Sequence, residues 1–133
     1  MLASFQKIEL VSEYVKERSK EVAQDNEAKN VDVSQLINGR RLTNIGVLRV
    51  YIEHYLSANP NINENMTTMV RQLQPTATGL PLEIYTFSKI KAWKEYEYIM
   101  ADVFDHILAA LPAFELEVFE NPSSSDFRKL YGE

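Results

Sequence analysis

Two histidines and their acidic neighbours are the residues of this chain with the clearest capacity for chemistry. Asp102 and His106 stand four residues apart within a helical pattern, so their side chains would share one face of a helix. A carboxylate and an imidazole at that spacing can bind a metal ion. Two ligands do not complete a metal site, and the sequence offers no second cluster to join them. We therefore expect a hydrogen-bonded His106, a half-buried His54 and no bound metal.

Signatures of the common catalytic machineries do not occur in this sequence. The chain has no cysteine, which excludes a thiol nucleophile, a disulfide framework and a cysteine-ligated metal. It contains no G-x-S-x-G, no P-loop and no G-x-G-x-x-G, and four glycines in all leave little material for a phosphate-binding loop. The sequence therefore predicts a protein that is not an enzyme and that uses no cofactor.

Charged residues suit contacts between parts of an assembly better than they suit catalysis. Arg40 and Arg41 follow the turn signal Asn38-Gly39, and Arg71 lies inside a run that predicts a strand. An arginine in a strand needs an acidic partner or solvent. We interpret Arg40, Arg41, Arg71 and Asp105 as candidate salt-bridge or interface residues between domains or subunits.

Composition limits the class of protein and of partner. The chain of 133 residues is long enough for one domain with its own core, and its net charge of −5 disfavours nucleic acid as a partner. No apolar run reaches the roughly 20 residues needed to span a bilayer, and the first residues lack the pattern of a signal peptide. We expect the chain itself to be soluble.

The first part of the chain predicts a long amphipathic helix over residues 3 to about 28. Its apolar residues recur at helical spacing and form a narrow stripe, opposite a side that is dense in charge. The stripe can pack against the same chain or against a partner in an assembly, and the pattern leaves both open. The stripe consists of Phe5, Ile8, Val11, Val15 and Val22.

The rest of the chain alternates helical and strand patterns. Thr43 is a suitable N-cap for a helix over residues 44–57, and Pro60 follows its end. The runs 66–74 and 80–88, separated by Pro75 and Gly79, predict a β-hairpin. A second long helix is predicted over 92–111, well buried against the sheet through a face widened by Met100, Phe104 and Leu108. The run FELEVF at 114–119 alternates as a last strand.

These elements predict an α+β fold in the order αββαβ after the long N-terminal helix. That order is a ferredoxin-like split βαβ unit that lacks its first strand. The missing strand would be central in the sheet, and an empty central position leaves backbone groups unpaired. We therefore expect the strands to rearrange or to pair across a dimer. The predicted organisation is an N-terminal helix over 1–30, an α/β domain over 31–122 and a C-terminal tail over 123–133.

Three stretches taken together resemble a known family. They are NGRRLTNIGVLRVYIEHYL (38–56), MTTMVRQLQPTATGLPLEIYTFS (66–88) and YEYIMADVFDHILAALPAFELEVFENPS (96–123). In combination they resemble the C-terminal cytosolic region of bacterial MscS-family mechanosensitive channels, in the miniconductance, YbdG-like branch. The resemblance covers most of the chain, including the charged helix before residue 38.

The resemblance implies a role in an inner-membrane channel that protects cells from osmotic downshock. Such channels are homoheptamers, and this chain resembles the α/β domain of their vestibule on the cytoplasmic side, attached to the membrane only through a transmembrane region that is absent here. No gating residue can be carried over, and the sequence leaves open whether the isolated chain is a monomer, a dimer or a heptamer. The alternative is a free-standing ferredoxin-like regulatory module that binds a small molecule, because fold alone does not determine function.

Overall fold

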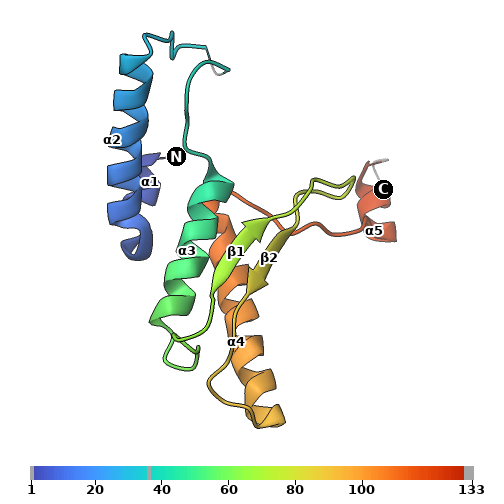
Figure 1. Ribbon diagram of the computed structural model, residues 1–133. Coiled ribbons are helices and arrows are strands. Elements are labelled where there is room, and N and C mark those ends of the chain that lie inside the picture. Colours follow the sequence, from blue (N-terminus) through green and yellow to red (C-terminus); the bar gives the residue numbers. More distant parts are fainter. Residues whose placement is uncertain (1, 36, 131–133) are drawn as a thin grey trace.

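The chain forms an α+β structure in which helices dominate and the only sheet of the described residues has two strands (Figure 1). The computed structural model describes residues 2–35 and 37–130, with the backbone alone at Leu2 and Phe127. In chain order the elements are α1 (Leu2–Phe5), the 3-10 helix η1 (Glu9–Val11), α2 (Ser12–Ala28), α3 (Asn44–Ala58), β1 (Met69–Gln72), β2 (Leu82–Tyr85), α4 (Trp93–Ala110), the 3-10 helix η2 (Leu111–Phe114) and α5 (Ser124–Leu130).

Helix α3 is the centre of the core. The hydroxyl of Thr43 accepts a hydrogen bond from the backbone N–H of Gly46, which confirms the predicted N-cap. Helix α3 contacts η1, β1 and η2, so elements from both ends of the chain pack on it. Its buried residues are Val47, Leu48, Val50, Ile52 and Leu56.

The N-terminal region is divided, where the sequence predicted one helix over 3–28. Helix α1 ends at Phe5, Ile8 is extended, and the chain restarts through η1 into α2. This break places the Phe5 ring 5.5 Å from the ring of Phe114, at the other end of the chain. The predicted stripe is nevertheless confirmed, because Phe5, Val11 and Val15 are fully buried. Packing of Phe5 into the core thus prevails over the continuity of the helical pattern.

The predicted hairpin is present. Strands β1 and β2 are antiparallel, with Val70 opposite Ile84 and Arg71 opposite Glu83. Each strand has four residues, so the paired part is shorter than the runs that predicted it. In the turn between them, Thr76 and Gly79 pair through an isolated antiparallel bridge. Gly79 has a positive φ of +130°, which favours glycine.

The last strand predicted, over 114–119, is wrong for this chain. Phe114 closes η2, and Glu115 takes a left-handed conformation with φ of 58°. The N–H of Leu116 then bonds to the carbonyl of Leu111, as in a helix C-cap. Residues 116–123 have no regular structure. A strand needs a neighbour, and this segment pairs with no strand of residues 2–35 and 37–130.

The prediction that α4 is well buried is also wrong in part. Ile99, Val103 and Ile107 are buried, but Phe104 is 59% exposed and Leu108 is 50% exposed. One stripe of α4 faces the core and the other faces solvent. The predicted tail contains the short helix α5, which begins with a hydrogen bond from the backbone N–H of Ser123 to the carboxylate of Asp126.

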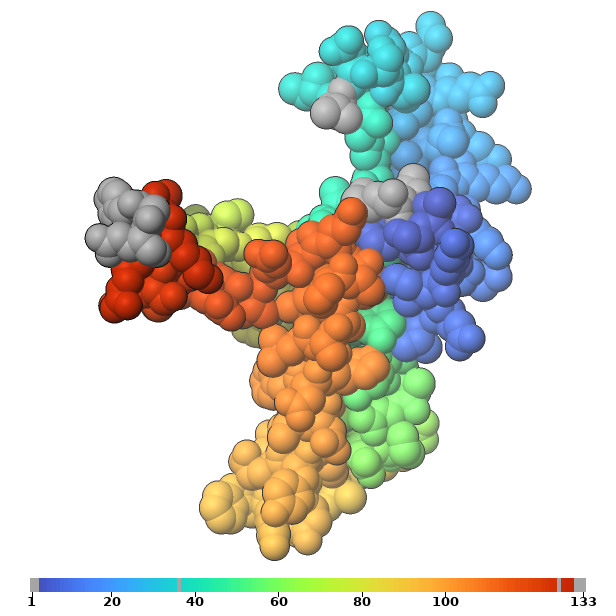
Figure 2. Space-filling view, turned by 180° about the vertical axis from the view of Figure 1, so that it is seen from behind, coloured from blue at the N-terminus to red at the C-terminus, as the bar shows by residue number. Residues whose placement is uncertain are grey.

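The elements spread into an open shape. Helices α1 and α2 lie on one side of the central elements, and α5 projects on the other side, at the far end of the C-terminal segment (Figure 1). The reverse view shows the same separation, with the red C-terminal lobe standing away from the blue N-terminal helices (Figure 2). The single chain thus leaves much surface between its lobes.

Candidate functional site

The four residues predicted for salt bridges or interfaces lie in three separate places. Arg40 is 3.6 Å from Glu21 and 3.8 Å from Asp25, so it connects the loop after α2 to α2 itself. Arg71 forms an ion pair of 2.7 Å with Glu83 across the hairpin. Asp105 is exposed on α4. Their use at a domain or subunit contact stays a prediction.

Asn26 holds the loop of residues 31–43 against α2. Its side-chain amide donates to the carbonyl of Arg40 at 2.9 Å, and its side-chain oxygen accepts the N–H of Arg40 at 2.8 Å. Asn26 is the one polar residue among the described buried residues. Gly39 lies directly beside it with φ of +72°, and a Cβ at that position would be 2.4 Å from the Asn26 oxygen. Asn26 and Gly39 therefore depend on each other.

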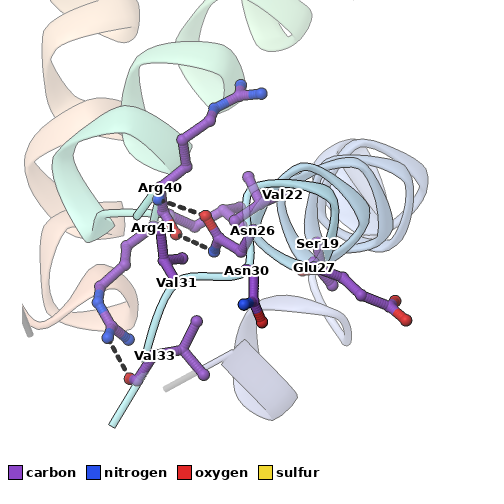
Figure 3. Close-up of a pocket in the computed structure, with 11 residues that line it drawn as sticks. Ser19, Val22, Asn26, Glu27, Asn30, Val31, Val33, Arg40 and Arg41 are labelled. Atoms are coloured by element: carbon purple, nitrogen blue, oxygen red, sulfur yellow. Dashed lines mark hydrogen bonds between the residues drawn. The ribbon is translucent and has the colours of Figure 1, made fainter. Parts of the chain in front are cut away.

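A groove of about 750 Å³ opens between α2 and this loop (Figure 3). Its apolar lining comes from Val22, Val31, Val33 and Leu42. Two of its polar side chains are turned onto the chain, since Asn26 bonds to the backbone of Arg40 and Arg41 donates to the carbonyls of Val33 and Gln35. Figure 3 shows the Arg40 side chain directed away from Asn26. The groove thus combines apolar surface with the buried hydroxyl of Ser19, which has no hydrogen-bond partner among the described residues.

His106 is enclosed by two tyrosines of α3. The hydroxyl of Tyr51 is 2.6 Å from Nε2 of His106, and the Tyr55 ring stacks on the imidazole with centroids 3.9 Å apart. Burial, followed by the charge of Tyr55, raises the pKa of Tyr51; burial, followed by the charge of Asp102, raises the pKa of Tyr55. The expected hydrogen-bonded His106 is confirmed. This cluster fastens α4 to α3 beside a small cavity of about 250 Å³.

His54 bonds to the chain as well, through Nδ1 and the carbonyl of Leu10, and it is exposed, where the sequence predicted a half-buried side chain. Within residues 2–35 and 37–130, no three His, Asp or Glu side chains gather closely enough to hold a metal ion. None of the helices in that part of the chain has the length and apolar character needed to cross a membrane.

Sequence reasoning missed Asn26 and the two tyrosines around His106. Asn26 continues the stripe of α2, four residues after Val22, and a polar residue at a core position is a usable signal for a buried hydrogen bond. The partnership of Tyr51 with His106 spans 55 residues, and helical spacing within α3 gives no sign of it. Compared with known protein families and with solved structures, the chain matches none.

Proposed function

We propose that this chain is a non-catalytic vestibule domain of an MscS-like mechanosensitive channel, on the cytoplasmic side of the inner membrane. In this role it supports assembly of the homo-oligomer and forms part of the wall through which solutes reach the pore. Its fold would be a ferredoxin-like unit that lacks its first strand and whose last strand, over 114–119, is not formed in the single chain. The support from sequence is the resemblance of the three stretches 38–56, 66–88 and 96–123.

The observation that carries the proposal is the area that the single chain leaves exposed. The chain exposes 9795 Å², whereas a compact monomer of 15.3 kDa exposes about 7,100 Å². The excess of roughly 2,700 Å² exceeds the ~800 Å² that one partner contributes to an interface of standard size. A subunit of a ring meets two neighbours through different surfaces. An excess large enough for more than one contact therefore favours a ring subunit over a free-standing monomer.

Apolar side chains are part of this exposed area. The outer stripe of α4 exposes Phe104 and Leu108, and Trp93 in its first turn is 78% exposed. Large exposed apolar patches mark interaction sites in soluble proteins. The net charge of −5 would give the wall of an assembled vestibule a negative field that modestly favours cations.

The proposal is tested on the native gene product in its own cells. An antibody raised against this chain is used on membrane and soluble fractions, and intact cells are treated with a cross-linker before lysis. We expect a product much heavier than 15.3 kDa in the membrane fraction, extracted only by detergent, with a ladder of cross-linked species. A soluble product of about this chain's mass would overturn the channel role.

The alternative function, a module that binds a small molecule, has one observation in its favour. The groove between α2 and residues 31–43 has a volume of about 750 Å³, within the range of about 300–1,000 Å³ that is typical of ligand pockets. Asn26, Arg40 and Arg41 already bond to the chain, and the buried Ser19 hydroxyl is a polar group of the groove left to orient a ligand. Thermal stabilisation of the purified chain by one metabolite class, lost in a Val22→Trp variant that fills the groove, would favour the alternative.

A further inference from the structure

The two outer edges of the hairpin differ in one respect that determines where a further strand can add. On the edge of β1 that faces away from β2, the N–H of Val70 donates to the carboxylate of Glu53 on α3 at 3.2 Å. The same carboxylate holds Arg49 at 3.4 Å. A charged side chain over a strand edge is a common way to stop further pairing. The outer edge of β1 is therefore occupied by the chain itself.

The outer edge of β2 has no such cover. Because Val70 bonds outward to Glu53, the pair of Val70 and Ile84 is one whose backbone groups point away from each other. The bond from Leu73 N–H to the Pro81 carbonyl fits the same alternation. The N–H and C=O groups of Leu82 and Ile84 thus point outward from the hairpin. Within the described part of the chain, none of them has a hydrogen-bond partner.

A matching segment exists at the other end of the chain. Residues 116–119 belong to the run that predicted a strand, yet Val118 and Phe119 are about half-exposed. The backbone groups of residues 117–120 bond to no described residue. The start of this segment is anchored in its own chain, since Asn44 donates to the Phe114 carbonyl and Leu116 to that of Leu111. It forms no hydrogen bond with β2 of the same chain.

We propose that the outer edge of β2 binds residues 116–121 of a second copy of this chain as an additional antiparallel strand. Addition of a strand to an open sheet edge is a common mode of recognition. This strand pairing would be the contact between subunits in the assembly proposed above, and its relevance in the cell rests on that proposed function. Passed from one copy to the next around a ring, it would pair each copy's open edge with the free segment of its neighbour. In an isolated pair of chains, reciprocal exchange about a twofold axis would pair both edges and both segments.

Charge and side-chain pairing favour one register. With the strands antiparallel and Phe119 opposite Tyr85, two aromatic rings meet on the solvent face, and Glu115 lies opposite Lys89. A shift of the partner by four residues in one direction would place Glu117 opposite Glu83, which is a like-charge pair. The register also places Asn121 opposite Glu83, on the same face of the extended sheet.

The absence of cysteine makes this contact directly testable. One batch of the chain carries Glu83→Cys, a second carries Asn121→Cys, and the two are mixed with oxidised glutathione. We expect a disulfide-linked heterodimer of twice the chain mass of 15.3 kDa. The matched control pairs Asn121→Cys with Arg71→Cys. That variant breaks the same ion pair with Glu83, but its thiol lies one strand, or about 5 Å, further from the partner.

Three outcomes overturn the proposal. They are no heterodimer, equal yields from Glu83→Cys and from Arg71→Cys, and stronger linkage of Glu83→Cys chains to each other, which would mean that two β2 edges pair directly. None of these outcomes bears on the membrane location of the native product, so the two proposals fail separately.

A second measurement needs no thiol. Light scattering at rising concentration should detect a dimer of the unmodified chain, and Val118→Pro should weaken its Kd about tenfold or more, because proline removes a donor to the neighbouring strand. Val118→Ile keeps the donor and should keep the Kd. Since Val118 is half-exposed, both variants should unfold at the same urea concentration when dilute. A Kd that Val118→Pro leaves unchanged would overturn the proposal.

Discussion

Helices α3 and α4 are alike in length and both are rich in apolar residues, yet the chain covers them very differently. Helix α3 packs against η1, β1 and η2 and buries five apolar side chains. Helix α4 buries three, while Phe104 and Leu108 on its other stripe remain largely in solvent. Composition is therefore not what separates the two helices. What separates them is the number of elements that the chain can place around each.

This difference indicates which parts of the molecule form a unit without partners. Around α3, residues from Phe5 to Phe114 close a single core, and the rings of Phe5 and Phe114, from opposite ends of the chain, meet there. The outer stripe of α4, the edge of β2 and residues 116–121 lie outside that core. In an assembly these are the surfaces that neighbouring subunits would cover. Substitutions in the two regions should consequently have unequal effects.

The largest effect is expected for truncation of the α3 core. Ile52→Ala should lower the free energy of unfolding by about 2–5 kcal/mol, because Ile52 is fully buried and the site cannot collapse around the lost methyl groups. Leu108→Ala on the outer stripe of α4 should change it by less than about 0.5 kcal/mol. Urea unfolding of the purified chain measures both. Equal losses of unfolding free energy would show that α4 is as well covered as α3, which would contradict the difference between the two helices.

A smaller loss is expected where α2 is fastened to the rest of the chain. Asn26→Ala leaves the N–H and C=O of Arg40 without their side-chain partners in a partly buried position, at a cost of about 1–3 kcal/mol. Gln24→Ala, an exposed position on the same helix, is the control. Limited proteolysis should also cut the loop of residues 31–43 faster in the Asn26→Ala variant. An unchanged cleavage rate would mean that Asn26 does not hold this loop.

The N-terminal ends of α3 and α4 differ, so one substitution at each should change the free energy of unfolding in opposite directions. Thr43→Ala removes the side-chain cap of α3 and should cost about 1 kcal/mol. The measurement is again urea unfolding, with Thr67→Ala, an exposed threonine outside the helices, as the control. A loss no larger than that of the control would mean that the hydrogen bond from Gly46 contributes little.

Helix α4 begins without a side-chain cap, since Ala92 stands at its N-cap position. Ala92→Ser should therefore stabilise the chain by about 0.5–1 kcal/mol, provided that the first turn of α4 is formed in solution. No gain would mean that this turn, which carries the exposed Trp93, is frayed in the isolated chain. The ellipticity at 222 nm should become more negative, and the urea concentration at the midpoint of unfolding should increase with it.

Sequence patterns predicted the helices and the hairpin well because these elements follow from local spacing and local caps. Thr43 caps α3 as predicted, and the predicted apolar stripe of Phe5, Val11 and Val15 is buried. The failures are at positions where the outcome depends on a distant neighbour. The run 114–119 has the alternation of a strand but no edge to pair with, and the break after Phe5 depends on Phe114, more than a hundred residues away.

The candidate site was less predictable for the same reason. Arg40 and Arg71 were recognised as charges that require partners, and both have them. The identity of those partners depends on how the loop of residues 31–43 returns to α2, which the buried Asn26 determines. His106 and its partner Tyr51 lie on different helices, so no spacing rule relates them.

The smallest effect concerns the cluster that fastens α4 to α3. Because burial raises the pKa values of Tyr51 and Tyr55 above the ordinary 10.0, the folded chain holds these phenolic protons more tightly than the unfolded chain does. The stability that they contribute is thus fully present below about pH 10 and is lost as the pH rises through the folded pKa values. Unfolding free energy should fall with pH in that range.

The double variant Tyr51→Phe/Tyr55→Phe isolates this contribution from that of the other groups that titrate in alkali. It removes both phenols but keeps the rings that stack on His106. Its unfolding free energy should fall less steeply with pH than that of the unmodified chain. The ultraviolet absorbance of phenolate should show that, in the double variant, two fewer tyrosines titrate above the ordinary pKa of 10.0. The same dependence of unfolding free energy on pH in both chains would mean that α4 is not held closely enough against α3 to bury these side chains. His106 would then belong to the open region of the molecule and not to the covered one.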